Sequence, residues 1–207
     1  MIIQPIVEGH GEVEAVPVLL RRLQVELREY GFQIARPIRR KRSELVTEEQ
    51  VRRSVRLAMG TPQCAGILII FDSDDDCPAT IGPLIQQWAQ TEAGHILCQV
   101  VLAKREYEAW FIGAVESLRN IRGIRANATS HPEPETVRDC KGALEKRMST
   151  SNSYSPSVDQ AAFTAMLDLR AAYQACRSFR RVTSAFGRLA AAAGSAVQTW
   201  PPPNWQG

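Results

Sequence analysis

The sequence has little of what marks a disulfide-bonded, zinc-binding or membrane-spanning protein. Its five cysteines form no C-x-x-C pair and their number is odd, which argues against a disulfide framework or a zinc cluster. The three histidines share no metal-binding spacing. No apolar run approaches the roughly 18 residues that a membrane helix needs, and no basic leader precedes an apolar core at the N-terminus. We therefore expect a cytoplasmic protein with no membrane contact.

The overall composition is that of a folded protein. The chain has 207 residues, of which 44% are hydrophobic and 23% charged. This balance is typical of globular domains and excludes a disordered chain. The formal net charge is +3, which permits a nucleic-acid partner without requiring one.

Apolar runs alternate with helical patterns over residues 1–118 and predict an α/β domain. We expect a mainly parallel, four-stranded, Rossmann-like sheet flanked by helices. The part from 119 to 199 is predicted to be a helical C-terminal extension, and 200–207 an extended tail rich in Pro and Trp. Strands are expected at 2–7, 32–38, 66–71 and 96–102, and helices near 80–92, 106–118, 136–148, 158–174 and 178–193.

Carboxylates follow two of the predicted strands at the point where each strand ends. The first strand runs into Glu8-Gly9-His10-Gly11-Glu12, and the third runs into Asp72-Ser73-Asp74-Asp75-Asp76. Gly9 and Gly11 are similar to a dinucleotide-binding turn, but Glu14 stands where that motif has its third glycine. The surrounding acids would also repel a pyrophosphate, so we do not expect a nucleotide cofactor.

These carboxylates predict a site for a divalent cation. In an extended chain Asp72 and Asp74 would point the same way, and two nearby carboxylates repel unless a cation lies between them. Oxygen ligands without His or Cys favour Mg²⁺ or Mn²⁺ over zinc. We assign Glu8, Asp72 and Asp74 as catalytic and metal-binding residues, with Glu12 as a further ligand. Acidic side chains at the start of a helix also have a purely structural explanation, since their negative charge interacts favourably with the helix dipole.

A third acidic segment follows the fourth strand at the same expected edge of the sheet. Glu106 is predicted to supply another metal ligand, and Lys104 to neutralise a phosphate. Glu108 is a second acidic candidate. The alternative is an ordinary helix start with favourable acids.

Basic residues are concentrated between the second strand and the following helix. Such a patch can hold nucleic-acid phosphates and makes binding dependent on salt; the alternative is a solvated, charged surface. The predicted phosphate-binding residues are Arg39, Arg40, Lys41, Arg42, Lys104 and Lys141.

Glu8-Gly9-His10-Gly11-Glu12 after one strand, with Asp72-Ser73-Asp74 after another, resembles the Toprim signature. That superfamily includes primases, topoisomerases and the overcoming-lysogenization-defect nucleases, and the E-G-x-x-E form is most similar to the nuclease branch. By this resemblance Glu8 carries the conserved glutamate, and Asp72 and Asp74 carry the D-x-D motif.

A narrower resemblance covers nearly the whole chain. The segments EYEAWF at 106–111, PE at 134–135, DCK at 139–141 and SF at 178–179 resemble the small bacterial Toprim-like family numbered 4276 among domains of unknown function. The resemblance implies a stand-alone Toprim-like domain whose gene often neighbours an ATPase gene of phage-defence type. Cys140 departs from the family's D-P-K run.

The resulting functional expectation is a Mg²⁺- or Mn²⁺-dependent enzyme that cleaves phosphodiester bonds in DNA or RNA. Glu8 could instead act as a general acid or base. The expected protein partners are an ATPase and a second copy of the chain. Two alternatives stay open: a non-catalytic partner subunit of an ATPase complex, and a phosphotransfer domain with Asp72 as nucleophile.

Overall fold

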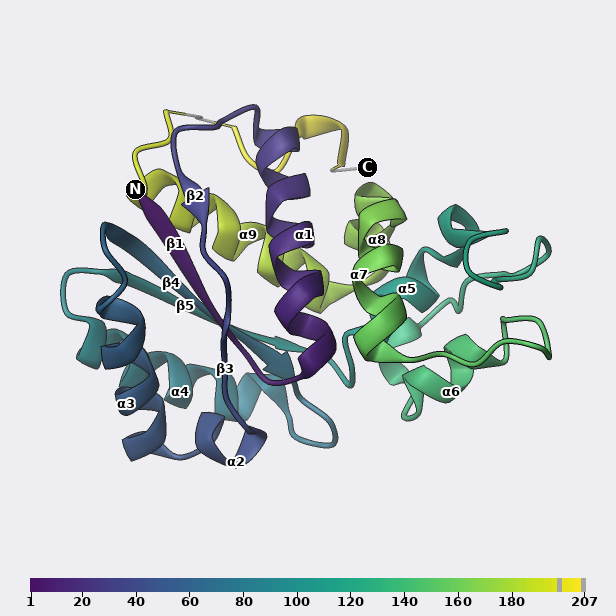
Figure 1. Ribbon diagram of the computed structural model, residues 1–207, viewed down its shortest axis with the longest axis horizontal. Coiled ribbons are helices and arrows are strands. Elements are labelled where there is room, and N and C mark those ends of the chain that lie inside the picture. The colour runs from purple at the N-terminus through teal and green to yellow at the C-terminus, as the bar shows by residue number, and fades with distance from the viewer. Residues whose placement is uncertain (197–198, 206–207) are drawn as a thin grey trace.

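A parallel β-sheet runs through the molecule, and helices lie against both of its faces (Figure 1). The computed structural model describes residues 1–196 and 199–205. The strand order is β2-β1-β4-β5, with β3 also paired to β1, and every pairing is parallel. The strands are β1 Ile2–Val7, β2 Gln33–Ile34, β3 Ile38–Arg39, β4 Cys64–Asp72 and β5 Leu97–Ala103.

The expected α/β fold with a mainly parallel sheet is confirmed, but the sheet has five strands rather than four. The predicted strand 32–38 is two short strands, because Pro37 lies between them and has no N–H for the ladder. Both pair with the same edge of β1. The main-chain oxygens of Ile3 and Val7 accept bonds on this edge, so Pro5 faces the gap between β2 and β3. Gln4 bridges the gap by donating to Arg36 O at 2.9 Å.

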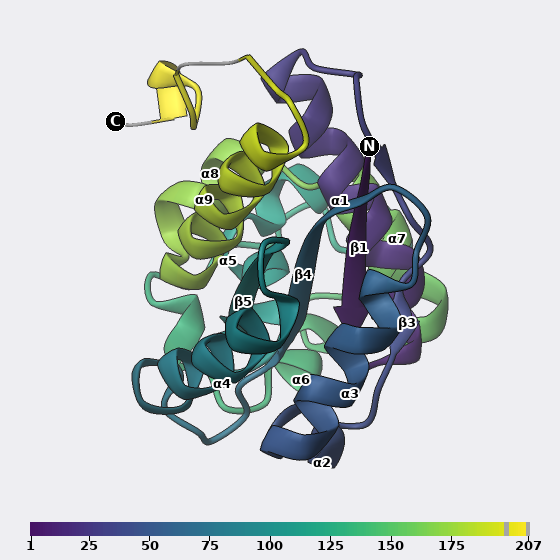
Figure 2. The same ribbon diagram turned by 90° about the vertical axis from the view of Figure 1, so that its left-hand side faces the viewer.

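Alternate residues of β4 enter the cores on the two sides of the sheet, as the period of a strand requires. Ile69 and Phe71 pack with α3 (Glu48–Met59) and α4 (Pro78–Ala93). Leu68 and Ile70 belong to the other core, with α1 (His10–Leu27) and α9 (Arg177–Ala192). Figure 2 shows the sheet between these two layers.

The back third of the chain is helical, as predicted. The helix expected at 178–193 corresponds to α9, whereas those expected at 136–148 and 158–174 are shorter. Predicted helix 158–174 is interrupted at Asp168, whose side chain accepts from Ala171 N and starts a new helix. The tail, predicted to be extended, contains a short 3-10 helix, and Trp205 in it is buried. The remaining helices are α2 Arg42–Leu45, α5 Glu108–Gly113, η1 Val115–Leu118, η2 Pro134–Thr136, α6 Cys140–Glu145, α7 Pro156–Met166, α8 Leu169–Ala175 and η3 Pro203–Trp205.

Helix α7 packs closely along α1, and Gly11 makes the approach possible. A Cβ at Gly11 would lie 2.5 Å from the main-chain oxygen of Pro156 and would also collide with the Gln160 side chain. Within the described part of the chain, no helix is both long and apolar enough to cross a bilayer.

The contact between α1 and α7 can be tested at Gly11. Gly11→Ala is expected to lower the free energy of unfolding by roughly 1–3 kcal/mol, because the Pro156 backbone must move to admit the methyl group. Urea denaturation measures the change. Gly31→Ala is the matched control, since nothing lies within 4 Å of a Cβ there, and it is expected to be neutral or stabilising by less than about 1 kcal/mol. Equal losses at both positions would contradict close α1–α7 packing.

Candidate functional site

The carboxyl ends of β1, β4 and β5 lie at one edge of the sheet, toward the region between α2 and α6 (Figure 1). Glu8 directly follows β1, Asp72 ends β4, and Glu108 begins α5 just after β5. The charges of Glu12 and Glu108 act on Asp72, and the charge of Glu8 acts on Glu12. Burial, and then the charges of Glu12 and Glu108, raise the pKa of the Asp72 carboxyl well above its ordinary value. The structure therefore brings carboxylates from three separate strand ends into one cluster.

Glu12 fixes the turn from β1 into α1. Its Oε2 accepts hydrogen bonds from Glu8 N at 2.9 Å and Gly9 N at 2.6 Å, so the carboxylate caps the start of the helix. The residue is only 5% exposed. Burial raises the pKa of Glu12 to about 7, the two main-chain donors oppose this shift, and the charges of Glu8 and Glu108 add to it. One of its oxygens is thus committed to the backbone.

Glu8 lies beside this turn with one oxygen unsatisfied. Its Oε2 is buried and accepts no hydrogen bond from any described residue. Burial raises the pKa of Glu8, Arg42 and Lys141 lower it, and Asp74 raises it. The charges of Arg42, Lys141 and Asp74 therefore all act on Glu8.

Asp72 is held by the loop that follows β5. Its Oδ1 accepts from Tyr107 N at 2.8 Å. Next to it, the fully buried Ser73 accepts from Arg105 N at 3.0 Å through Oγ. Asp74 N in turn donates to Arg105 O. These bonds fix the ends of β4 and β5 relative to each other and orient the Asp72 carboxylate.

Asp74 does not continue the strand, so the expectation that it points the same way as Asp72 by strand alternation is wrong. Strand β4 ends at Asp72, and Asp74 has a φ of +48°, a left-handed conformation that aspartate tolerates better than most residues. Its side chain is 54% exposed and lies 3.4 Å from Arg42. Asp74 reaches the cluster from a turn at its outer side.

Of the two acids in the third segment, Glu108 enters the cluster more deeply than Glu106. Glu106 accepts from the main-chain N and from Nζ of Lys141, at 3.0 and 2.9 Å. Glu108 is fully buried; Tyr154 donates to its Oε1 at 2.8 Å, and its Oε2 has no hydrogen bond within the described residues. The metal set inferred from the sequence contained Glu106. The sequence signal that could have found Glu108 is its position two residues after Glu106 in an E-x-E pattern.

Lys141, at the start of α6, supplies a positive charge inside the acidic cluster. Its ammonium lies 2.9 Å from Glu106 and 3.8 Å from Glu108. Burial alone would lower the pKa of Lys141, but the charges of Glu108, Glu106 and Asp72 outweigh burial and raise it above the ordinary value. The ammonium therefore stays protonated at neutral pH and offsets part of the repulsion.

The donor chemistry fits a hard divalent cation, although the carboxylates are not gathered as a ready-made cage. Over residues 1–196 and 199–205, no group of three or more His, Cys, Asp or Glu side chains is arranged so that it could hold a metal ion. Two buried carboxylate oxygens, Glu8 Oε2 and Glu108 Oε2, nevertheless lack hydrogen bonds. An all-oxygen set with unsatisfied acceptors matches the preference of Mg²⁺ and Mn²⁺.

The predicted phosphate-binding residues divide into two groups. Arg39 and Lys41 are exposed, and their side chains have no hydrogen-bond or ion-pair partner among the described residues. Lys104 is half-buried beside the site. Arg40 donates to Ser54 Oγ at 3.1 Å, and Arg42 is bound to the Asp loop. Arg39, Lys41 and Lys104 are therefore the side chains that stay available to a ligand.

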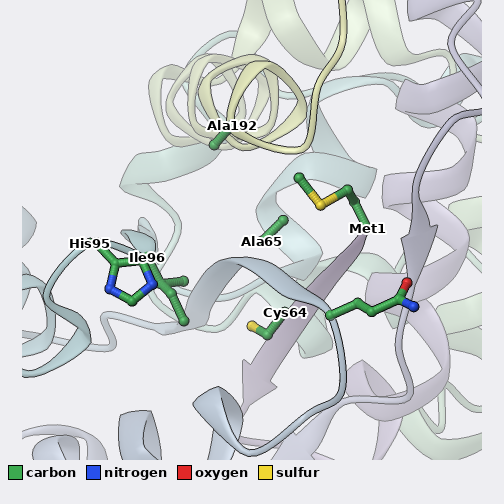
Figure 3. A pocket seen from close by; sticks show the side chains of 7 residues that line it. Met1, Cys64, Ala65, His95, Ile96 and Ala192 are labelled. Atoms are coloured by element: carbon green, nitrogen blue, oxygen red, sulfur yellow. The ribbon is translucent and has the colours of Figure 1, made fainter.

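A cavity of about 560 Å³ lies at the opposite end of the sheet, near the start of β1 (Figure 3). Met1, Cys64, His95 and Ala192 are among the residues that line it. No carboxylate lines it, and burial raises the pKa of the Cys64 thiol. The cavity is separate from the acidic cluster and offers little chemistry of its own.

A family model described as Domain of unknown function (DUF4276) matches residues 7–186. The chain belongs to this family. The match spans every residue of the acidic cluster, from Glu8 to Lys141, and confirms the family number that the narrower resemblance indicated. No curated protein and no solved structure matches the chain. The DUF4276 assignment thus leaves the chemistry to be argued from the site itself.

The buried Glu12 makes the stability of this DUF4276 protein depend on pH. Because its pKa is about 7 in the folded state against 4.5 ordinarily, the folded protein holds a proton that the unfolded chain has lost, and stability falls as pH rises from about 4.5 to 7. Glu12→Gln keeps an oxygen for both main-chain donors. In chelator, this variant is expected to be more stable than wild type by roughly 1–3 kcal/mol at pH 8 and nearly equal to it at pH 5.

Urea denaturation at both pH values measures this difference. Glu14→Gln is the control, because Glu14 is exposed on the same helix, and it should leave the pH dependence unchanged. If Glu12→Gln does not raise the free energy of unfolding at pH 8, the ionised Glu12 carboxylate does not destabilise the folded protein.

Removal of the Lys141 ammonium should have the opposite effect on stability at pH 8, because it leaves the carboxylates without a positive partner. Lys141→Met is expected to lower the free energy of unfolding by about 1–2 kcal/mol at pH 8, a value moderated by the partial exposure of the lysine. The loss should shrink at pH 5, where the carboxylates take up protons. Lys146→Met removes an exposed lysine at the end of the same helix and should change stability by less than about 0.5 kcal/mol. A loss independent of pH would contradict the counter-ion role.

Proposed function

We propose that this DUF4276 protein is a Toprim-like, Mg²⁺- or Mn²⁺-dependent phosphodiesterase that cleaves nucleic acid. The observation that supports the proposal is that Glu8, Asp72 and Glu108 follow neighbouring parallel strand ends and are linked electrostatically through Glu12, with buried Glu8 and Glu108 oxygens that lack hydrogen bonds from the described residues. In open parallel α/β sheets, ligands bind outside the carboxyl ends of the strands. The order of the acidic motifs along the chain supports the Toprim assignment by resemblance.

Glu8, Asp72 and Asp74 would hold the metal, with Glu108 or Glu106 as further oxygen donors. Glu12 is a weaker candidate than the sequence indicated, because one of its oxygens already caps α1. A bound divalent cation would lower the pKa of a water molecule and stabilise negative charge on a phosphoryl group.

The chain's own residues would position the substrate. Arg39, Lys41 and Lys104 are free to contact phosphates on either side of the acidic cluster, which predicts binding that weakens as salt rises. Lys141 would add positive charge next to the phosphate at the cluster. Burial raises the pKa of Glu8, and Glu8 could exchange a proton with water as a general acid or base does.

A second candidate is a non-catalytic partner subunit of an ATPase complex. The absence of a ready-made metal group among the described residues, with Lys141 already bound to two of the carboxylates, favours this alternative. The Trp and Pro tail gives it less support, since Trp205 is buried in its own chain. A cytoplasmic role in phage defence, beside an ATPase, is compatible with either candidate, and all five cysteines are free.

Nicking of supercoiled plasmid in Mg²⁺ or Mn²⁺ tests the first candidate against the second. Wild type is expected to nick DNA, and Glu8→Gln and Asp72→Asn should reduce the rate roughly 100-fold or more, as loss of a catalytic acid or electrostatic group does. Glu14→Gln, which alters an exposed acid outside the cluster, should retain the wild-type rate. Chelator should abolish cleavage.

The outcomes separate the possibilities. No cleavage of DNA or RNA by wild type, alone or with a candidate partner ATPase, would sink the nuclease proposal and leave the partner subunit. Equal cleavage by all variants would identify a contaminant. A phosphoryl group found on Asp72 would instead support the phosphotransfer alternative.

A further inference from the structure

Arg42 does not use its guanidinium to face solvent, as the basic run around it would suggest. It donates to the main-chain oxygens of Asp72 and Ser73 and to Asp76 Oδ2, the last at 2.5 Å. The same group lies 3.4 Å from Asp74 Oδ2 and stacks 5.7 Å above the Phe71 ring. One side chain thus contacts five of the six residues from 71 to 76.

We propose that Arg42 is a positioning residue that holds the Asp72–Asp76 loop in the conformation needed for cation binding, rather than a phosphate-binding residue. The loop needs such support, because Asp74 has a left-handed backbone and its carboxylate is otherwise open to solvent. Its acidic side chains also repel one another, and Arg42 supplies the nearest positive charge to Asp74 and Asp76.

The local sequence presents Arg42 for this task. Strand β3 pairs with β1 and directs the chain along the carboxyl edge of the sheet. Helix α2 then begins at Arg42, and Glu44 closes its first turn by accepting from Lys41 N at 2.8 Å. Phe71, which stacks against the guanidinium, is fully buried. This set of contacts between Arg42 and the Asp72–Asp76 loop, the Arg42 clamp, is therefore anchored by the start of α2 on one side and by the end of β4 on the other.

A planar guanidinium suits this arrangement better than an ammonium. Its donors are fixed in a fork and can reach two main-chain oxygens and a carboxylate at the same time. Lysine has a single nitrogen centre and cannot span these acceptors. Arg42→Lys therefore separates charge from geometry, because it keeps the positive charge and loses the fork of donors.

Hydrogen exchange of the metal-free protein gives a direct test. The amides of Asp74, Asp76 and Tyr107 report on the loop, since they donate to Arg105 O, Ser73 O and Asp72 Oδ1 respectively. In Arg42→Met, exchange of these amides is expected to accelerate roughly tenfold or more, because the loop opens locally. Amides inside α1 should be unchanged. Arg42→Lys should resemble Arg42→Met, and Arg53→Met, which removes an exposed arginine of α3, should resemble wild type.

Calorimetric titration with Mn²⁺ gives the second readout, which rests on the proposed function. Arg42→Met and Arg42→Lys should bind Mn²⁺ roughly 10- to 100-fold more weakly than wild type, the usual effect of losing a residue that orients metal ligands. If Arg42→Met does not fold, Asp76→Asn removes one anchor of the clamp and should give a smaller acceleration at the same amides.

Amide exchange and Mn²⁺ affinity test different parts of the proposal. Unchanged amide exchange in Arg42→Met would overturn the clamp, and so would full recovery by Arg42→Lys. Loosened amides with unchanged Mn²⁺ affinity would overturn its role in cation binding. If wild type binds no Mn²⁺, the metal-dependent function and the positioning role toward it both fall, while amide exchange still decides whether Arg42 holds the loop.

Discussion

Repulsion among carboxylates confined at one edge of the sheet is the constraint on which the rest of this structure depends. Parallel strands end together, so Glu8, Asp72 and Glu108 are forced into the same region by the fold itself. The chain relieves the repulsion in three ways. Main-chain donors bind Glu12 and Asp72, protons are retained by the carboxyls whose pKa values are raised, and Lys141 and Arg42 bring positive charge from the helices that begin nearby.

This partial balance of charge explains why the acidic cluster keeps buried carboxylate oxygens that have no hydrogen-bond partner among the described residues. A site that served only for stability would gain from replacing buried acids by apolar residues, since burying unpaired charge is costly. Glu8 Oε2 and Glu108 Oε2 instead lie buried and accept no hydrogen bond from the described residues. Such groups are typical of sites where a ligand completes the set of partners. The Lys141 ammonium, 3.8 Å from Glu108 Oε2, supplies part of the positive charge that these acids need.

The sequence was sufficient for the elements whose signal is local. The apolar runs at 2–7 and 66–71 predicted strands β1 and β4 closely, and the carboxylates after them predicted where acidic side chains gather. A proline has no N–H for the ladder of a central strand, but Pro5 fits in β1 because it faces the gap that Pro37 leaves between β2 and β3. That arrangement depends on the pairing of distant segments. Strand alternation failed at Asp74, because the chain leaves the strand two residues earlier to bond with Arg105.

The roles of Glu108, Lys141 and Arg42 could not be predicted, since each is set by contacts between residues far apart in sequence. Arg42 belonged to a basic run that indicated phosphate binding, and only the packing of α2 beside the Asp loop reveals its other partners. The central claim is that the carboxyl edge of the sheet binds a divalent cation. Anomalous diffraction from crystals soaked in Mn²⁺ tests it most directly. The account predicts a peak within bonding distance of Glu8, Asp72 and Asp74; a fully soaked crystal with no peak there, and with Lys141 still bound to Glu106, would contradict it.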